Sequence, residues 1–209
     1  MKQLNAKKFA EIYSSSMPPK VRVLKDGTVD VMKHSMFYWK GGNGRDIVLY
    51  TGDAQPKNPD AAYALADKAL EIAQSLGTET VLTVGAYITG EFSGEPKVFG
   101  TGTDKESLKE LEEMGVRSIN AGSITWMNGL LVGLSKLRNM KAVFLSGETS
   151  GYIVDAGAAR AVLLVLSKKL GIPIDLTELD LKAKESEHLV KSMEAMKGQA
   201  EKDETGYIG

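Results

Sequence analysis

Short apolar segments alternate with amphipathic helical patterns through most of this chain, and that alternation constrains the fold more than any other feature. Residues 47–50 are a continuous apolar run, typical of a strand that is buried on both faces. Further strand candidates follow at residues 80–84, 116–119 and 142–145. Strands joined by helical connections predict an α/β fold, in which a mainly parallel sheet carries helices on both faces.

Four segments between and after these strands show helical features, and they span residues 59–76, 104–114, 126–137 and 155–170. In the first and last, apolar side chains recur every three or four positions and form one stripe. Asp155 stands where an N-cap would, and Thr103 or Asp104 could cap the second helix. Gly171 follows the last helix as a stop signal.

The N-terminal segment has a different pattern. Asp26-Gly27 lies between the β-branched segments 21–23 and 29–31, which predicts a β-hairpin, and residues 34–39 are a candidate third strand. We divide the chain into a polar arm and β-hairpin integrated into the domain (1–45), an α/β core (46–175), a C-terminal helix (176–198) and a flexible tail (199–209). The thin apolar stripe of the charged C-terminal helix fits either the flank of its own domain or a seam between subunits.

Composition excludes several function classes. The 209 residues are 43% hydrophobic and 25% charged, as in soluble globular proteins. With 26 basic and 27 acidic residues, the net charge of −1 argues against nucleic-acid or anionic-membrane binding. Zero cysteines and only two histidines, His34 and His188, exclude disulfides, thiolate metal sites and multi-histidine zinc sites. We therefore predict no metal site and no cofactor.

The chain also lacks the apolar segments that direct proteins into or across membranes. Its first residues are polar and lysine-bearing, unlike a secretory signal. The longest apolar run, residues 161–166, is far shorter than the roughly 20 residues that span a bilayer. We expect a cytoplasmic protein.

Three polar, glycine-bearing loops follow the predicted strands, at residues 51–56, 85–102 and 146–152. Loops at the carboxyl ends of strands are the usual ligand sites of such sheets, and backbone N–H groups before a helix can bind an anion. The same residues could instead serve only as helix caps and turns. The candidate pocket residues are Gly52, Asp53, Gln55, Thr101, Gly147, Glu148, Thr149 and Ser150.

No catalytic set can be assembled from the sequence. The phosphate-binding motif G-x-x-x-x-G-K-[ST] and the dinucleotide motif G-x-G-x-x-G are both missing. Ser146 and Ser150 do not lie in a G-x-S-x-G elbow. His34 and His188 are poor partners for a serine, because one lies in a predicted strand and the other in the charged C-terminal helix. We interpret Trp39 and Trp126 as core or interface anchors.

The loops themselves resemble a known family. Gly52-Asp53-Ala54-Gln55-Pro56, the segment Gly-Leu-Leu-Val-Gly-Leu at 129–134, and above all residues 147–155 resemble the archaeal branch of the proteasome assembly chaperone family, the PAC2-type domain. The similarity runs from about residue 46 to about residue 187. It implies a fold like that of nucleoside phosphorylases, homo-oligomers, and binding to the proteasome core particle as an assembly chaperone or ATP-independent activator. It implies no enzymatic activity.

The resemblance also implies that a C-terminal tail contacts the proteasome α-subunits through a tyrosine and the terminal carboxylate. The sequence ends Gly206-Tyr207-Ile208-Gly209, so the tyrosine is third from the end, where the family motif has it second. We assign partner binding to Tyr207, Ile208 and Gly209. Two alternatives stay open: a nucleoside or phosphorylated ligand bound at the carboxyl end of the sheet, and a purely structural oligomer.

Overall fold

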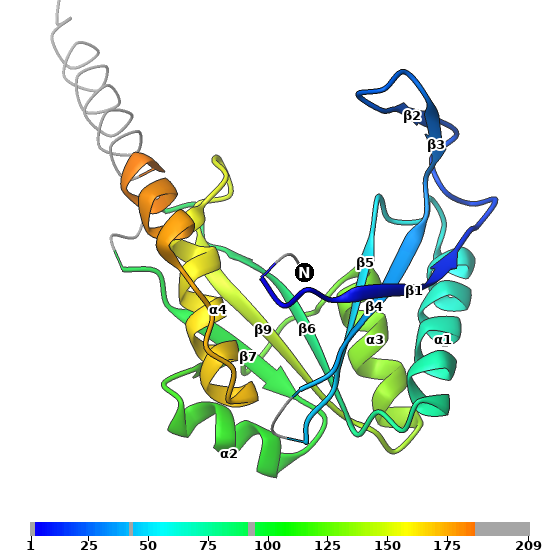
Figure 1. Cartoon of the computed structure of the whole chain (residues 1–209). Coiled ribbons are helices and arrows are strands. Elements are labelled where there is room, and N and C mark those ends of the chain that lie inside the picture. The colour runs from blue at the N-terminus through cyan, green and yellow to red at the C-terminus, as the bar shows by residue number, and fades with distance from the viewer. Residues whose placement is uncertain (1–2, 42–43, 92–94, 187–209) are drawn as a thin grey trace, which may run out of the picture. The chain divides into compact units, whose positions relative to one another are not determined.

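The chain divides into two compact units. The computed structural model describes residues 3–41, 44–91 and 95–186 (Figure 1). The first unit comprises Met1–Thr83, Gly102–Ser107 and Ala121–Phe144, and the second comprises Val84–Thr101, Leu108–Asn120 and Leu145–Gly209. The tail 199–209 and residues 187–198 of the predicted C-terminal helix lie outside the described residues, whereas residues 177–186 are helical.

A three-stranded antiparallel sheet in the order β1-β4-β5 belongs to the first unit, formed by β1 (Lys7–Ile12), β4 (His34–Trp39) and β5 (Ile47–Gly52). The predicted polar arm therefore contains a strand. Residues 47–50 were expected to be buried on both faces of a parallel sheet, and this is wrong, because β5 is partly exposed and pairs antiparallel with β4. An apolar run of four residues does not reveal which partner it pairs with.

The predicted β-hairpin is confirmed. β2 (Val21–Val23) and β3 (Val29–Val31) pair antiparallel in a separate two-stranded sheet. Gly27 has a φ of 82°, a conformation that favours glycine. Asp26 Oδ1 accepts hydrogen bonds from the backbone N (3.0 Å) and the hydroxyl (2.7 Å) of Thr28, which holds the turn. Figure 1 shows the hairpin extending beyond the end of β4.

The core of the first unit lies where helices α1 (Pro59–Ser75) and α3 (Trp126–Leu137) pack together beside β4. Asn58 caps α1, because its Oδ1 accepts from Ala61 N at 2.8 Å, and Pro59 suits the first helical position. The cluster buries one face of each helix. Its buried members are Met36, Ala62, Leu65, Ala66, Ala69, Leu70, Met127 and Leu131.

A second sheet has four strands in the order β6-β9-β7-β8, namely β6 (Thr80–Ile88), β9 (Lys141–Thr149), β7 (Val98–Gly102) and β8 (Arg117–Ser118). β7 and β8 are parallel. β7 was not predicted, because its two glycines suggested a loop, and the strand predicted at residues 142–145 ends four residues before β9 does. With three antiparallel pairings elsewhere, the molecule has a mixed α/β fold rather than a mainly parallel sheet.

Two further helices each begin at an aspartate cap. α4 (Ala156–Leu170) begins at the predicted cap, where Asp155 Oδ1 accepts from Ala158 N at 2.9 Å, and Gly171 ends it with a φ of 67°. α2 (Lys105–Glu113) is capped by Asp104, whose Oδ1 accepts from Ser107 N at 2.8 Å. Across the described ranges, no helix combines the length and the apolar character needed to span a membrane.

Candidate functional site

The candidate pocket residues fall into two groups, one in each unit. Gly52, Asp53 and Gln55 belong to the first unit, and the other five to the second. The prediction that all of them lie in loops is wrong: Gly52 ends β5, Thr101 is in β7, and residues 147–149 are in β9. The strands extend further than their apolar runs suggest, because backbone pairing continues through glycine and polar residues.

Asp53 joins the hairpin to the three-stranded sheet. Its Oδ1 accepts from Arg22 Nη1 at 2.9 Å and its Oδ2 from Lys33 N at 3.2 Å, while Asp53 N donates to Lys33 O at 3.0 Å. Both carboxylate oxygens are thus occupied by groups of the same unit. Asp53 therefore fixes the base of the hairpin against the end of β5.

A charge network continues from Asp53 along the hairpin. Lys33 Nζ lies 2.9 Å from Asp30 Oδ1 and 3.2 Å from Glu11 Oε1. The hydrogen bonds of Lys8, Tyr13 and Lys33 lower the pKa of Glu11 to about 2. The same two acidic partners, Asp30 first, raise the pKa of Lys33. These groups therefore stay ionised and paired at neutral pH.

Gly52 makes room for a buried histidine. An ideal Cβ at this position would lie 2.3 Å from His34 Cε1, so any larger residue would displace the ring. His34 is only 3% exposed, its Nε2 is 2.9 Å from the Ala54 carbonyl oxygen, and its ring stacks on Tyr50 with centroids 5.2 Å apart. Within the described structure His34 Nδ1 and the Tyr50 hydroxyl have no hydrogen-bond partner.

Burial sets the protonation of this pair. It lowers the pKa of His34, against the opposing effects of the Ala54 carbonyl and the Asp53 charge, and it raises the pKa of the Tyr50 hydroxyl. Both side chains are therefore neutral at neutral pH. The neutral, buried ring of His34 packs against the ring of Tyr50.

Gln55 caps a helix that is distant in sequence. Its Oε1 accepts from Met127 N at 3.2 Å, at the start of α3, where Thr125 makes no side-chain capping bond. Trp126, the first residue of α3, has a left-handed φ of 57° and is 45% exposed, so it is no core anchor. Gln55 thus satisfies a helix N-terminus that its own sequence leaves uncapped.

In the second unit, Glu148 connects β9 to the segment before β7. Its Oε2 accepts from Lys97 N at 3.1 Å, and Glu148 N donates to Lys97 O at 2.8 Å. On the other side of β9, Thr89 N donates to Thr149 O at 3.0 Å. Glu148 therefore satisfies a backbone donor of the segment that precedes β7. Thr101, on β7, is partly buried.

At the end of β9 and just after it, two side-chain hydroxyls accept hydrogen bonds from backbone N–H groups two residues further on. Thr149 Oγ1 accepts from Gly151 N at 3.3 Å and Ser150 Oγ accepts from Tyr152 N at 3.3 Å. At the start of α4 the Asp155 carboxylate occupies the place that a bound anion would take. These bonds favour the cap-and-turn interpretation of this segment over a phosphate site.

Three exposed apolar residues in and beside this segment were not singled out from the sequence. Ile88, at the end of β6, is 69% exposed, and Tyr152 and Val154 are 72% and 93% exposed. Ile88 borders Gly151, where an ideal Cβ would lie 2.9 Å from Ile88 Cγ2. The available signal was the pattern Tyr152-Ile153-Val154 within a polar turn.

Metal ligands do not gather anywhere in the part of the chain that the structure describes: no three histidine or acidic side chains there could hold an ion together. The carboxylates of Asp53, Glu148 and Asp155 each accept a backbone or guanidinium donor.

The fold and the sequence together define the class of this protein. The sequence pattern of the PAC2 family matches residues 1–194, and the chain belongs to this family. The resemblance seen in residues 52–56, 129–134 and 147–155 is thereby confirmed.

Two relatives with solved structures and one matched by sequence show what the chain is similar to. The chain is similar to Pyrococcus furiosus PbaB, described as an archaeal proteasome activator, with 38% identity, a TM-score of 0.83, and coverage of 91% of this chain and 83% of that one. It is also similar to Pyrococcus furiosus PbaA, an archaeal homolog of proteasome-assembly chaperone, with 27% identity, a TM-score of 0.75, and coverage of 99% and 86%. An uncharacterized protein of Methanocaldococcus jannaschii is 30% identical over 192 residues, which are 91% of this chain and 74% of that protein.

Proposed function

We propose that this protein binds the proteasome core particle, as an activator or an assembly chaperone. The observation that carries the proposal is the similarity to PbaB, which extends over nine-tenths of the chain at 38% identity. PbaA supports the same assignment at lower identity. In this proposal the protein is cytoplasmic, and its core has the arrangement of nucleoside phosphorylases without their reaction.

The proposed role is non-enzymatic. The candidate acidic residues accept hydrogen bonds from their own unit: Asp53 from Arg22 and Lys33, and Glu148 from Lys97. A general base or nucleophile needs a free lone pair aimed at a substrate. These bonds support positioning roles for both carboxylates.

We assign the contact with the proteasome α-subunits to Tyr207, Ile208 and Gly209, in a homo-oligomer that presents several tails together. One aromatic and one aliphatic side chain bind weakly alone, because ordering each backbone unit costs about 1–2 kcal/mol. Several tails on one oligomer raise the overall affinity through effective concentration. The proposal therefore couples tail binding to oligomerisation.

The experiment is capture of purified archaeal proteasome core particle by the tagged full chain. Deletion of residues 206–209 should abolish capture while the fold and the oligomer mass are unchanged, and Tyr207→Ala should remove most of it. Tyr63→Ala is the matched control, because Tyr63 is also a tyrosine and is 54% exposed, but it lies on α1 of the first unit. Capture that survives the deletion undiminished would place the contact on the folded units instead.

A further inference from the structure

The β2–β3 hairpin has one apolar and one charged face. Val21 pairs with Val31 and Val23 with Val29, so these four side chains share a face, while the Arg22–Asp30 pair lies on the other. All four valines are between 54% and 69% exposed. A ribbon of two strands is marginal in water unless its apolar face is covered.

The charged face, not the apolar one, holds the hairpin to its unit. Arg22 bridges Asp30 at 3.1 Å and Asp53 at 2.9 Å, and Lys33 bridges Asp30 at 2.9 Å. In most sheets the apolar face packs inward and the polar face is solvated. In this hairpin the ion pairs lie on the face that is directed toward Asp53 and Lys33. The four valines therefore lie on the opposite face, away from these anchoring residues.

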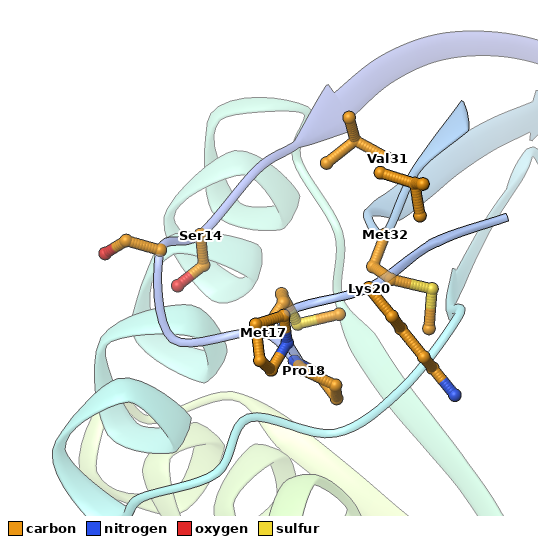
Figure 2. A pocket seen from close by; sticks show the side chains of 9 residues that line it. Ser14, Met17, Pro18, Lys20, Val31 and Met32 are labelled. Carbon is orange, nitrogen blue, oxygen red and sulfur yellow. The ribbon is translucent and has the colours of Figure 1, made fainter. Parts of the chain in front are cut away.

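A pocket of about 540 Å³ adjoins the valine face (Figure 2). Met17 and Met32, which are 6% and 8% exposed, contribute buried thioethers, and Pro18, Pro19 and Lys20 form part of its wall. Val21 and Val31 line the pocket and also belong to the valine face. The valine face and the pocket are therefore parts of one surface, which we call the valine surface: residues 17–21, 23, 24, 29, 31 and 32.

We propose that the valine surface is a subunit interface, and that its occupant is the same surface of a second copy of this chain. This inference rests on the homo-oligomer of the proposed function. Consider two hairpins packed with their valine faces together and related by a two-fold axis. If the axis lies between the two ribbons, parallel to their planes and perpendicular to their strands, β2 stacks on β2 of the second copy and runs in the opposite direction. Val21 would then face Val23 of the second copy, and Val29 would face Val31, so that every valine meets a valine.

The same two-fold rotation also brings the tip of each hairpin to the base of the other. It carries the hairpin tip of each copy, with the 39% exposed Leu24, toward the pocket of the other. Asp26, whose pKa is lowered by its bonds to Thr28, would approach the end where Lys20 of the second copy lines the pocket. Two symmetric ion pairs would thus flank the uncharged valine face, which is a self-complementary arrangement.

The area that a stable dimer must bury also favours an interface that includes both the valine face and the pocket. Four valines at this exposure form a patch on the order of a few hundred Å², whereas a standard interface takes about 800 Å² from each partner. The valine face alone is too small for a stable dimer. Seating each tip in the opposite pocket adds contact from Leu24 and from the methionine and proline side chains.

The experiment measures the mass of the full chain by light scattering at micromolar concentration. The variant Val23→Lys/Val29→Glu places opposite charges on a cross-strand pair, which keeps the hairpin paired but makes its face polar. Its oligomer should fall to a smaller mass, and circular dichroism should be unchanged. Tyr152→Lys/Val154→Glu, the same charges on exposed apolar residues of the second unit, should keep the mass of the unaltered chain.

Cross-linking identifies the contact directly. The chain has no cysteine, so Val21→Cys and Val23→Cys chains carry one thiol each. Face-packed sheets lie about 10 Å apart. A bis-maleimide of that reach should link a mixture of the two variants at least tenfold faster than it links a Val154→Cys control. Charge reversal at Asp26 should weaken association, and a second reversal at Lys20 should restore it.

The outcomes separate this inference from the proposed function. An oligomer whose mass is unchanged by Val23→Lys/Val29→Glu, and whose mixed thiols do not link, overturns the valine interface while homo-oligomerisation stands. A monomeric unaltered chain overturns both. If the charged variant keeps its mass but no longer captures proteasome, the valine surface contacts the proteasome instead, and the inference is again wrong.

Discussion

Gly52 in the first unit and Gly147 in the second occupy similar places near the end of a strand, yet their missing side chains serve different neighbours. At Gly52 an added Cβ would meet the ring of His34, at 2.3 to 2.7 Å. At Gly147 it would meet the backbone of α4, 2.6 Å from the Ala158 carbonyl oxygen and 3.0 Å from its carbon. Gly52 therefore leaves space for the His34 side chain, whereas Gly147 allows the backbone of α4 to approach β9.

The comparison explains why the sequence suggested ligand loops at both places. Glycine followed by polar residues is the pattern of a phosphate cradle, but it is also the pattern of close packing. A ring can be removed by a second mutation, whereas a helix backbone is fixed by its own hydrogen bonds. The two sites should therefore respond differently to the same substitution.

The largest expected effect is at Gly147. Gly147→Ala forces β9 and α4 apart, because the Ala158 backbone cannot move without the helix, and we expect the free energy of unfolding to fall by about 3 kcal/mol. Urea denaturation measures it. Gly133→Ala is the matched control: this exposed glycine inside α3 has no atom within 4 Å of an added Cβ, so alanine should stabilise by about 0.5–1 kcal/mol. Equal losses at both positions would refute the packing argument.

Gly52→Ala should destabilise by about 2 kcal/mol, because the buried His34 ring has little space to retreat. Since a side chain is the obstacle, the effect should shrink in a His34→Ala background. A double-mutant cycle in urea should give a coupling of about 1 kcal/mol or more between the two positions. Additive losses would mean that the backbone at Gly52, rather than the ring, is what alanine disturbs.

Helix caps offer a smaller test in each unit. Asp155→Ala removes the bond to Ala158 N of α4, and Asn58→Ala removes the bond to Ala61 N of α1. Each should lower the free energy of unfolding by about 1 kcal/mol. Asp155→Asn should retain most of the stability, because an amide oxygen caps as well. A loss of proteasome capture in Asp155→Ala at unchanged stability would instead assign the residue a contact role.

The smallest expected effect is a pH dependence that arises in the first unit. Burial lowers the pKa of folded His34, so the unfolded chain binds its proton more tightly. The resulting stability is complete above the unfolded pKa of about 6.5 and is lost as the pH falls below it. Urea midpoints between pH 7 and pH 5 should show this slope in the unaltered chain and in His188→Gln, but not in His34→Gln.

Signals within a few residues of each other were sufficient to predict helices α1, α2 and α4 and the β2–β3 hairpin. Asp155, Asp104 and Asp26-Gly27 act through bonds to residues at most three positions away, so their roles can be predicted without knowing the fold. The apolar stripe of residues 59–76 likewise predicted α1 almost to its last residue.

Pairing over long distances was not predictable in the same way. The Gln55 cap of α3 joins residues 72 positions apart, and the Glu148 bond to Lys97 spans 51. β1 was missed because its lysines and glutamate hide the apolar Phe9, Ala10 and Ile12, and β7 because of its glycines. The candidate residues were placed in loops for the same reason, since their strands are defined by partners rather than by their own composition.

The two-residue strand β8 has a consequence for how this protein can and cannot polymerise. It pairs with β7 only through Phe99–Arg117 and Gly100–Ser118, and it forms one edge of its sheet. An edge this short, with an arginine on it, offers incoming strands almost no backbone ladder to extend. Growth of that sheet from copy to copy is thereby blocked at β8, which protects a concentrated protein against fibre formation on this side.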